Sequence, residues 1–85
     1  MTTQGKRADL VDGRLVLNMG EYGKDAEGKW WARPPVQGFG MGRLGNHDIT
    51  EHEDGTITVS PSILMDWGEG RTWHGYLRKG IWEEV

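Results

Sequence analysis

Short apolar stretches separated by glycine-containing turns set the pattern along the whole chain. Apolar positions do not recur at helical spacing over several turns, whereas the alternation of apolar and polar residues that is typical of strands recurs several times. Fourteen glycines punctuate these stretches, which is about double the average usage. The pattern predicts an all-β fold, either a small antiparallel sheet or a partly open barrel built from short hairpins.

The beginning of the chain contains one clear turn signal. Residues 1–7 show no apolar alternation and are expected to be a flexible N-terminus, followed by a single β-rich domain over residues 8–85. Asp12-Gly13 favours a two-residue type I′ hairpin turn. Such a turn predicts a hairpin in which Leu10 lies opposite Leu15.

A polar segment and a short strand follow. Residues 18–29 are rich in Gly, Asp, Glu and Lys, and we expect them to form a loop. Trp30-Trp31-Ala32 predicts a strand that Pro34-Pro35 ends, because proline cannot donate to a strand ladder.

The best-defined hairpin spans residues 47–60. A three-residue loop, Glu53-Asp54-Gly55 with Gly55 in the left-handed conformation, pairs Ile49 with Val59 and separates apolar from polar side chains. A two-residue loop at the same place mixes the two faces, so we favour the three-residue loop.

The C-terminal third predicts further strands. Ser60-Pro61-Ser62 is expected to end the preceding strand or to mark a sheet edge. Ile63 to Trp67 predicts another strand, residues 68–70 a loop, and Thr72 to Val85 a final hairpin that turns at Lys79-Gly80.

Pairing about that last turn divides the final hairpin into two faces. One face carries the apolar residues Trp73, Leu77 and Trp82, which are candidate core residues. The other face carries His74, Tyr76, Arg78, Ile81 and Glu83.

Composition narrows the class of protein. The 85 residues suffice for one domain, and the absence of cysteine excludes a disulfide framework and a thiolate zinc site. Ten basic and thirteen acidic residues give a net charge of −3, which argues against a nucleic-acid partner. The sequence lacks a signal-peptide pattern and an apolar run of membrane-spanning length, so we expect a cytoplasmic protein without a membrane partner.

Two patterns resemble sites of chemistry. Residues 40–45 match G-x-G-x-x-G, but a strand is predicted to follow where a dinucleotide-binding motif needs a helix. We therefore interpret them as a tightly turning glycine loop, with a backbone anion site assisted by Arg43 as the alternative. His47 and His52 are predicted on opposite faces of one strand, so they do not share a metal ion, and no metal site or cofactor is expected.

The candidate binding residues come from the second face of the last hairpin. A tyrosine beside a histidine and an arginine on a rigid strand offers contact area at low entropic cost. A half-buried face without a ligand explains the same pattern. The candidate ligand-binding set is His74, Tyr76, Arg78, Arg43 and Arg71; no catalytic residue is assigned.

The C-terminal half also resembles a family of small domains of unknown function from bacteriophage and bacterial genomes. The family pairs a T-x-x-P-S-hydrophobic segment with a later C-H-x-F-[IL]-x-x-G segment. Here these are Thr58-Val59-Ser60-Pro61-Ser62-Ile63 and the stretch that begins Trp73-His74-Gly75-Tyr76-Leu77. The resemblance covers about residues 54–82; Trp73 stands where many members have cysteine, and His74 matches the family histidine.

These observations lead to three functional hypotheses. The first is a small phage-type accessory binding module that inhibits or sequesters a host protein or a small anionic ligand in the bacterial cytoplasm, with the phage origin implied by the resemblance. The second is a small metal-dependent or acid–base enzyme that uses His74 with His47 or His52. The third is a structural phage protein or homo-oligomer that buries its second face between subunits.

Overall fold

The computed structural model describes residues 2–85, and its strands form two small sheets. The larger sheet has the strand order β1-β9-β8-β7-β6 and the smaller one the order β2-β3-β4-β5. All pairings are antiparallel except that of β2 with β3. The strands are β1 (Thr2–Gln4), β2 (Lys6–Arg7), β3 (Glu21–Lys24), β4 (Trp30–Ala32), β5 (Gly42–Arg43), β6 (Asp48–Glu51), β7 (Ile57–Gly68), β8 (Arg71–Arg78) and β9 (Ile81–Glu84).

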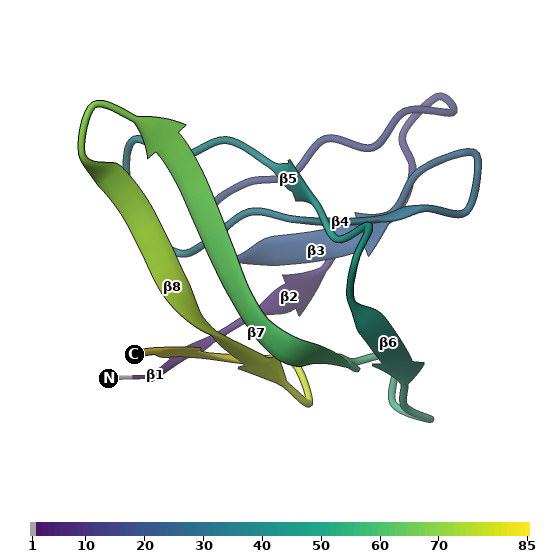
Figure 1. Cartoon of the computed structure of the whole chain (residues 1–85). Helices are drawn as coiled ribbons and strands as arrows, with labels where there is room; N and C mark the ends of the chain where they lie inside the picture. Colours follow the sequence, from purple (N-terminus) through teal and green to yellow (C-terminus); the bar gives the residue numbers. More distant parts are fainter. Residues whose placement is uncertain (1) are drawn as a thin grey trace.

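The predicted all-β class is confirmed, with two sheets that are not closed into a barrel. Figure 1 shows the long β7–β8 hairpin running across the direction of β3 and β4, which lie behind it. No helix among residues 2–85 has the length and apolar character needed to cross a membrane.

The chain passes from the larger to the smaller sheet at Gly5, between β1 and β2. The Gly5 N–H donates to the Gly80 carbonyl at 2.7 Å. A Cβ at Gly5 would lie 2.6 Å from that oxygen and 2.9 Å from Nε1 of Trp82, so only glycine fits this crossing without a shift. The sequence pattern indicated no strand in residues 1–7, yet β1 and β2 form here. Met1 lies outside the described residues. The predicted flexibility of residues 1–7 stays a prediction.

The core lies between the two sheets and contains the predicted tryptophans. Trp73 and Trp82 are 2% and 1% exposed, and their rings meet edge to face with centroids 5.3 Å apart. The Trp82 indole also donates to the Gly20 carbonyl at 2.9 Å, which ties the last hairpin to the segment before β3. The remaining core residues include Tyr22, Ala32, Ile57, Val59, Ile63, Met65 and Leu77.

The two strongest hairpin predictions are confirmed in register. Ile49 pairs with Val59, and Gly55 has a φ of 88° in the predicted three-residue loop. In the last hairpin Leu77 pairs with Trp82 across the Lys79-Gly80 turn, both of whose residues have positive φ. Trp30–Ala32 also forms the predicted strand, β4.

Of the two expectations for Ser60-Pro61-Ser62, the one that it ends the preceding strand is wrong, whereas the one that it marks a sheet edge agrees with the pairing, because β6 pairs with β7 only as far as Ser60. β7 runs without interruption from Ile57 to Gly68, and its pairing with β8 instead shifts register between Val59 and Ile63. Pro61 lies within this irregular stretch, where its missing N–H does not interrupt a regular ladder.

Two expectations for the first half also need correction. The predicted loop at residues 18–29 contains β3, whose Gly23 pairs with Trp31. A Cβ at Gly23 would lie only 2.6 Å from the Ala8 carbonyl oxygen, so this position of β3 needs glycine. The glycine interrupts the alternation of apolar and polar side chains by which a strand is predicted from sequence. The Asp12-Gly13 turn is present, but its pairing is one isolated bridge, and the predicted ladder through Leu10 and Leu15 does not form.

Candidate functional site

The candidate site is the outer face of the larger sheet, the face that points away from the smaller sheet. Burial alternates along β8. The buried residues are Trp73, Gly75 and Leu77, and the exposed ones include His74 and Arg78. In Figure 1 the smaller sheet lies on one side of the β7–β8 hairpin only, and the other side is open. We use "outer face" for the side chains of Ser62, Leu64, His74, Tyr76, Arg78, Ile81 and Glu83.

His74 and His47 both contact Ser62. The His74 Nε2 lies 2.9 Å from Oγ of Ser62, and the His47 Nε2 lies 3.0 Å from the Ser62 main-chain carbonyl. Because a carbonyl only accepts, the His47 Nε2 carries the hydrogen and donates it. His52 instead contacts Thr58 Oγ1 at 2.6 Å, away from Ser62.

These contacts limit what the histidines do chemically. Within residues 2–85 no three His, Asp or Glu side chains lie close enough together to bind a metal ion. A serine nucleophile needs a base that a third group orients, and in residues 2–85 the only side-chain hydrogen bond of His74 goes to Ser62 itself. The arrangement is a polar contact on an open sheet surface.

Tyr76 and Arg78 form a pre-arranged pair on the same face. The guanidinium carbon of Arg78 lies 4.0 Å from the centroid of the Tyr76 ring, a cation–π geometry. An Arg78 nitrogen also lies 3.2 Å from a carboxylate oxygen of Glu83, which pairs with Tyr76 across the hairpin. Two contacts hold the arginine in place, which lowers the entropy lost when a ligand binds it.

Leu64 adds an apolar surface that the sequence analysis did not single out. It pairs with His74 across the β7–β8 ladder, and 66% of it is exposed. Ile81, on β9 beside Arg78, is 40% exposed. The signal for Leu64 was present, because its two neighbours Ile63 and Met65 are buried and strand alternation points it outward.

The structure does not gather all five predicted binding residues. His74, Tyr76 and Arg78 share the outer face, whereas Arg43 belongs to β5 of the smaller sheet. A shallow depression of about 550 Å³, lined in part by Arg43 and Leu64, links the two. Arg71 begins β8 at the end of the strand remote from Arg78, and it donates to the Gly38 carbonyl at 3.3 Å.

The glycines of residues 40–45 have a packing role. A Cβ at Gly42 would lie 3.2 Å from Met65, and one at Gly40 would touch the Trp67 ring at 3.7 Å. Trp67 in turn packs on Phe39 with ring centroids 5.7 Å apart. These residues lead into β5 and β6, as expected for a strand-linked loop and not for a dinucleotide motif.

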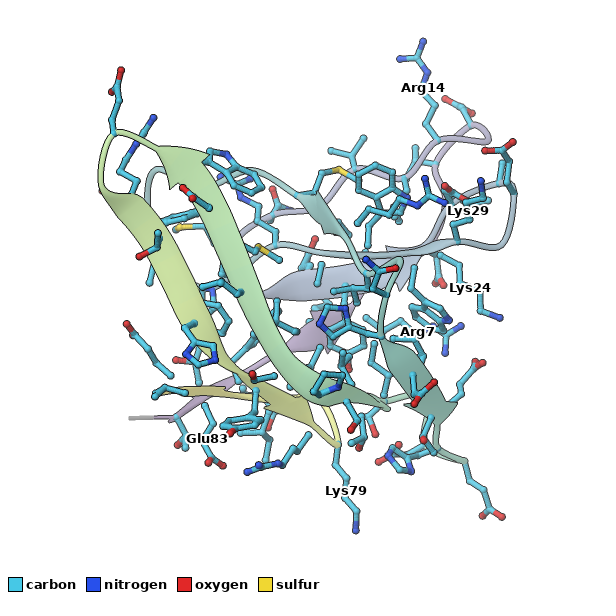
Figure 2. The ribbon with its side chains drawn as sticks, viewed as in Figure 1. Arg7, Arg14, Lys24, Lys29, Lys79 and Glu83 are labelled. Carbon is cyan, nitrogen blue, oxygen red and sulfur yellow. The ribbon has the colours of Figure 1, made fainter. Side chains whose placement is uncertain are left out.

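A second charged region lies around β3 and β4. Arg7 and Lys24 both contact the Glu51 carboxylate, at 2.7 and 3.5 Å, and the Arg7 hydrogen bond is the main reason that the pKa of Glu51 lies below its usual value. The pKa of Asp25 is also lowered, because the Lys29 main-chain N–H and the Trp31 indole donate to its carboxylate at 2.9 Å. Figure 2 shows Arg7, Lys24 and Lys29 on one side of the molecule, with Glu83 on the other.

The chain matches no family model, and neither a curated protein nor a solved structure matches it. The resemblance of residues 54–82 to the phage family stays a prediction, so the functional argument rests on the geometry of the outer face and of the charged region.

Proposed function

We propose that this protein is a non-enzymatic binding module whose outer face contacts a protein partner. The observation that carries the proposal is the exposed Leu64, which pairs with His74, on the same sheet face as the pre-arranged Tyr76–Arg78 pair. Tyrosine and arginine are enriched among the residues that dominate binding energy at protein interfaces, especially around an apolar centre.

The chemistry of the face favours a partner with apolar and acidic groups. Leu64 and Ile81 supply apolar contact, while His74 and Arg78 supply hydrogen-bond donors, one of them permanently charged. Glu83 already pairs with Arg78 but leaves the other guanidinium nitrogens available to a partner carboxylate. The resemblance to a phage family adds a host-directed role to this proposal, with a bacterial cytoplasmic protein as the partner that is inhibited or sequestered.

A second copy of the chain is the competing partner. A homo-oligomer would bury the same apolar surface between its subunits. The outer face would then not be available to a host protein. Sedimentation equilibrium of the purified protein separates the two: a monomer across the concentration range supports a foreign partner, and a dimer that Leu64→Ser dissociates supports self-association.

The proposal is tested by quantitative pull-down from a lysate of the bacterial host. Immobilised wild-type protein is compared with Leu64→Ser, with Tyr76→Ala, and with Val16→Ser as the control. Val16 is 65% exposed, nearly the same as Leu64, and lies outside the outer face. We expect a specific protein that the wild type and Val16→Ser retain and both outer-face variants lose; equal retention by all four would refute the proposal.

A further inference from the structure

The second half of β7 is an open strand edge. β7 runs from Ile57 to Gly68, but β6 pairs with it only as far as Ser60. Figure 1 shows β6 beside this end of β7 alone, while β8 follows β7 along its other side. Within residues 2–85, no strand pairs with the β6 side of β7 beyond Ser60. Part of β7 is therefore an edge, although β7 is not an outermost strand of the larger sheet.

The register shows which way the main chain of this stretch points. The Val85 N–H donates to the His74 carbonyl at 3.0 Å, so His74 directs its main-chain groups toward β9. Because these directions alternate along a strand, the β8 residues on either side of His74 bond to β7, and their partners there are Ile63 and Met65. Leu64, between those two partners, therefore turns its N–H and C=O to the open side.

The contact of His47 agrees with this direction. The Ser62 carbonyl, two residues before Leu64, accepts the His47 Nε2–H at 3.0 Å from the open side. Leu64 and Asp66 follow at the same spacing of two residues. No hydrogen bond within residues 2–85 reaches their main-chain groups from that side. Leu64 and Asp66 therefore present two N–H donors and two C=O acceptors to a further strand.

A depression of about 550 Å³ lies beside these groups. It is lined by Leu64, by Arg43 of β5, and by Gly45, Asn46 and His47 of the segment that leads into β6. Since His47 contacts the Ser62 carbonyl, this segment lies on the open side of β7. The depression thus leaves room beside Leu64, in line with the place that β6 occupies along the first part of β7.

The two outermost strands of the larger sheet present different edges. β1 offers the exposed polar residues Thr2–Gln4. β6 ends at Glu51, whose carboxylate is paired with Arg7 and Lys24. Of the three edges in residues 2–85, the one along β7 combines free main-chain groups with a largely exposed apolar side chain, Leu64, at 66%.

The surrounding side chains indicate what an added strand carries. The residue opposite Leu64 lies on the same face of the sheet, so an apolar side chain there covers Leu64. Its neighbours along that strand point to the other face, where β5 lies, because a Cβ at Gly42 would be 3.2 Å from the buried Met65 side chain. Arg43 follows Gly42, is exposed and has no ion pair within residues 2–85. An acidic side chain on that face complements its charge.

We infer that the edge of β7 at Leu64 and Asp66 binds an extended peptide segment that alternates apolar and acidic side chains and adds to the larger sheet as a strand. The added strand is antiparallel, like every pair in this sheet. The inference rests on the proposed protein partner and names the segment of that partner that covers Leu64.

The test is an NMR titration of the full chain with an acetylated and amidated Thr-Glu-Val-Glu-Val-Glu-Thr peptide. We expect saturable shifts and slower hydrogen exchange at the Leu64 and Asp66 amides, because both N–H groups gain an acceptor. The Ile63 and Met65 amides, already bonded to β8, are expected to change in exchange rate by less than about two-fold. No saturable shift, or shifts without slower exchange, would overturn the inference. Slower exchange at Leu64 and Asp66 in the protein alone as its concentration rises would overturn it too, since the edge would then pair with a second copy.

Modified peptides separate main-chain pairing from charge. In antiparallel addition the valine N–H groups bond to β7 and the glutamate N–H groups point away. N-methylation of both valines is therefore expected to abolish binding, and N-methylation of two glutamates to leave it within about two-fold. Equal binding of these two peptides would refute strand addition. A peptide with lysine at the three glutamate positions is expected to bind at least about five-fold more weakly, and equal binding would refute the acidic preference.

Variants of the protein complete the test. Arg43→Ala is expected to weaken binding of the acidic peptide about two- to five-fold, the effect of one exposed ion pair. Arg14→Ala removes the same charge from an exposed position away from β7 and is the matched control. Equal losses in both would refute the role of Arg43. The titration contains no host protein, so a failed titration together with a partner that Tyr76→Ala loses in the pull-down would refute strand addition and leave the outer face as the interface.

Discussion

Replacing Gly75 with alanine is expected to destabilise the fold, because this glycine lies where β8, β9 and the core tryptophan meet. A Cβ at Gly75 would be 2.5 Å from the Glu83 carbonyl oxygen and 2.6 Å from Cη2 of Trp73. Ordinary contact begins at 3.4 Å, so the Cβ would have to move 0.9 Å further from the Glu83 oxygen and 0.8 Å further from the Trp73 ring, the differences from 2.5 and 2.6 Å. Neither moves easily, since one is main chain of a paired strand and the other belongs to a ring that is 2% exposed.

Overpacking of this kind costs about 1–3 kcal/mol. For a domain of this size, each kcal/mol lowers the melting temperature by about 4–8 °C, so a drop of roughly 4–24 °C is expected. The assay is urea denaturation followed by tryptophan fluorescence, with thermal melts by circular dichroism.

Gly40→Ala is the matched control for this substitution. Its Cβ would meet only Trp67, at an ordinary 3.7 Å, and it is expected to change the free energy of unfolding by less than about 0.5 kcal/mol. Equal stability of Gly75→Ala and the wild type would refute the tight packing of β8 against β9 and against the core. The orientation of the outer face is argued from this packing.

Three further predictions concern a turn, the core and a surface carboxylate. Lys79→Asn is expected to raise the free energy of unfolding by about 0.5–1 kcal/mol, because Lys79 has a φ of 48° and asparagine tolerates this conformation better; urea denaturation measures it, and a decrease would contradict it. Trp82→Phe is expected to cost about 0.5–1.5 kcal/mol more than Trp73→Phe, because it removes the indole hydrogen bond to the Gly20 carbonyl, which keeps the Lys6 N–H, whereas the Trp73 Nε1 has no hydrogen-bond partner among residues 2–85; equal losses in parallel denaturation curves would argue against this hydrogen bond. The pKa of Asp25 is lowered in the folded state, so its carboxylate stabilises the fold above the ordinary pKa of 3.8, and this contribution is lost as the pH falls through the lower pKa of the folded state. The wild type is therefore expected to have a higher free energy of unfolding than Asp25→Asn at pH 7, and a difference between the two that stays constant down to pH 2 would be the contrary result.

Local turn chemistry explains which parts of the fold the sequence predicted. Gly55 and the Lys79-Gly80 turn join strands that are adjacent in the chain, so turn geometry and the alternation of side chains determine their registers together. β1 and β2 were not predicted, because their partners β9 and β3 are distant in sequence and Gly5 is needed for a contact with Trp82 that no local pattern reveals.

The same distinction applies to the candidate site. The alternation along β8 was enough to place His74, Tyr76 and Arg78 on one face away from the core. The contact of His47 with Ser62 depends on the pairing of β6 with β7 and on the irregularity beside Pro61, which the sequence indicated as a strand end or a sheet edge and not as a register shift within one strand. The sequence could not place Arg43 relative to this face, because Arg43 belongs to β5 of the smaller sheet and meets the face only at the depression that it lines with Leu64, while Arg71 lies at the other end of β8 from Arg78.

Photo-crosslinking in lysate tests the central claim, that the outer face contacts a protein partner, most directly. A benzoylphenylalanine is placed at Thr72, an exposed position on β8 on the same face as His74, and in a separate protein at Val16. The account predicts one dominant protein adduct from position 72, which Tyr76→Ala abolishes, and no such adduct from position 16. The same adducts from both positions, or none from position 72 while position 16 gives one, would contradict it.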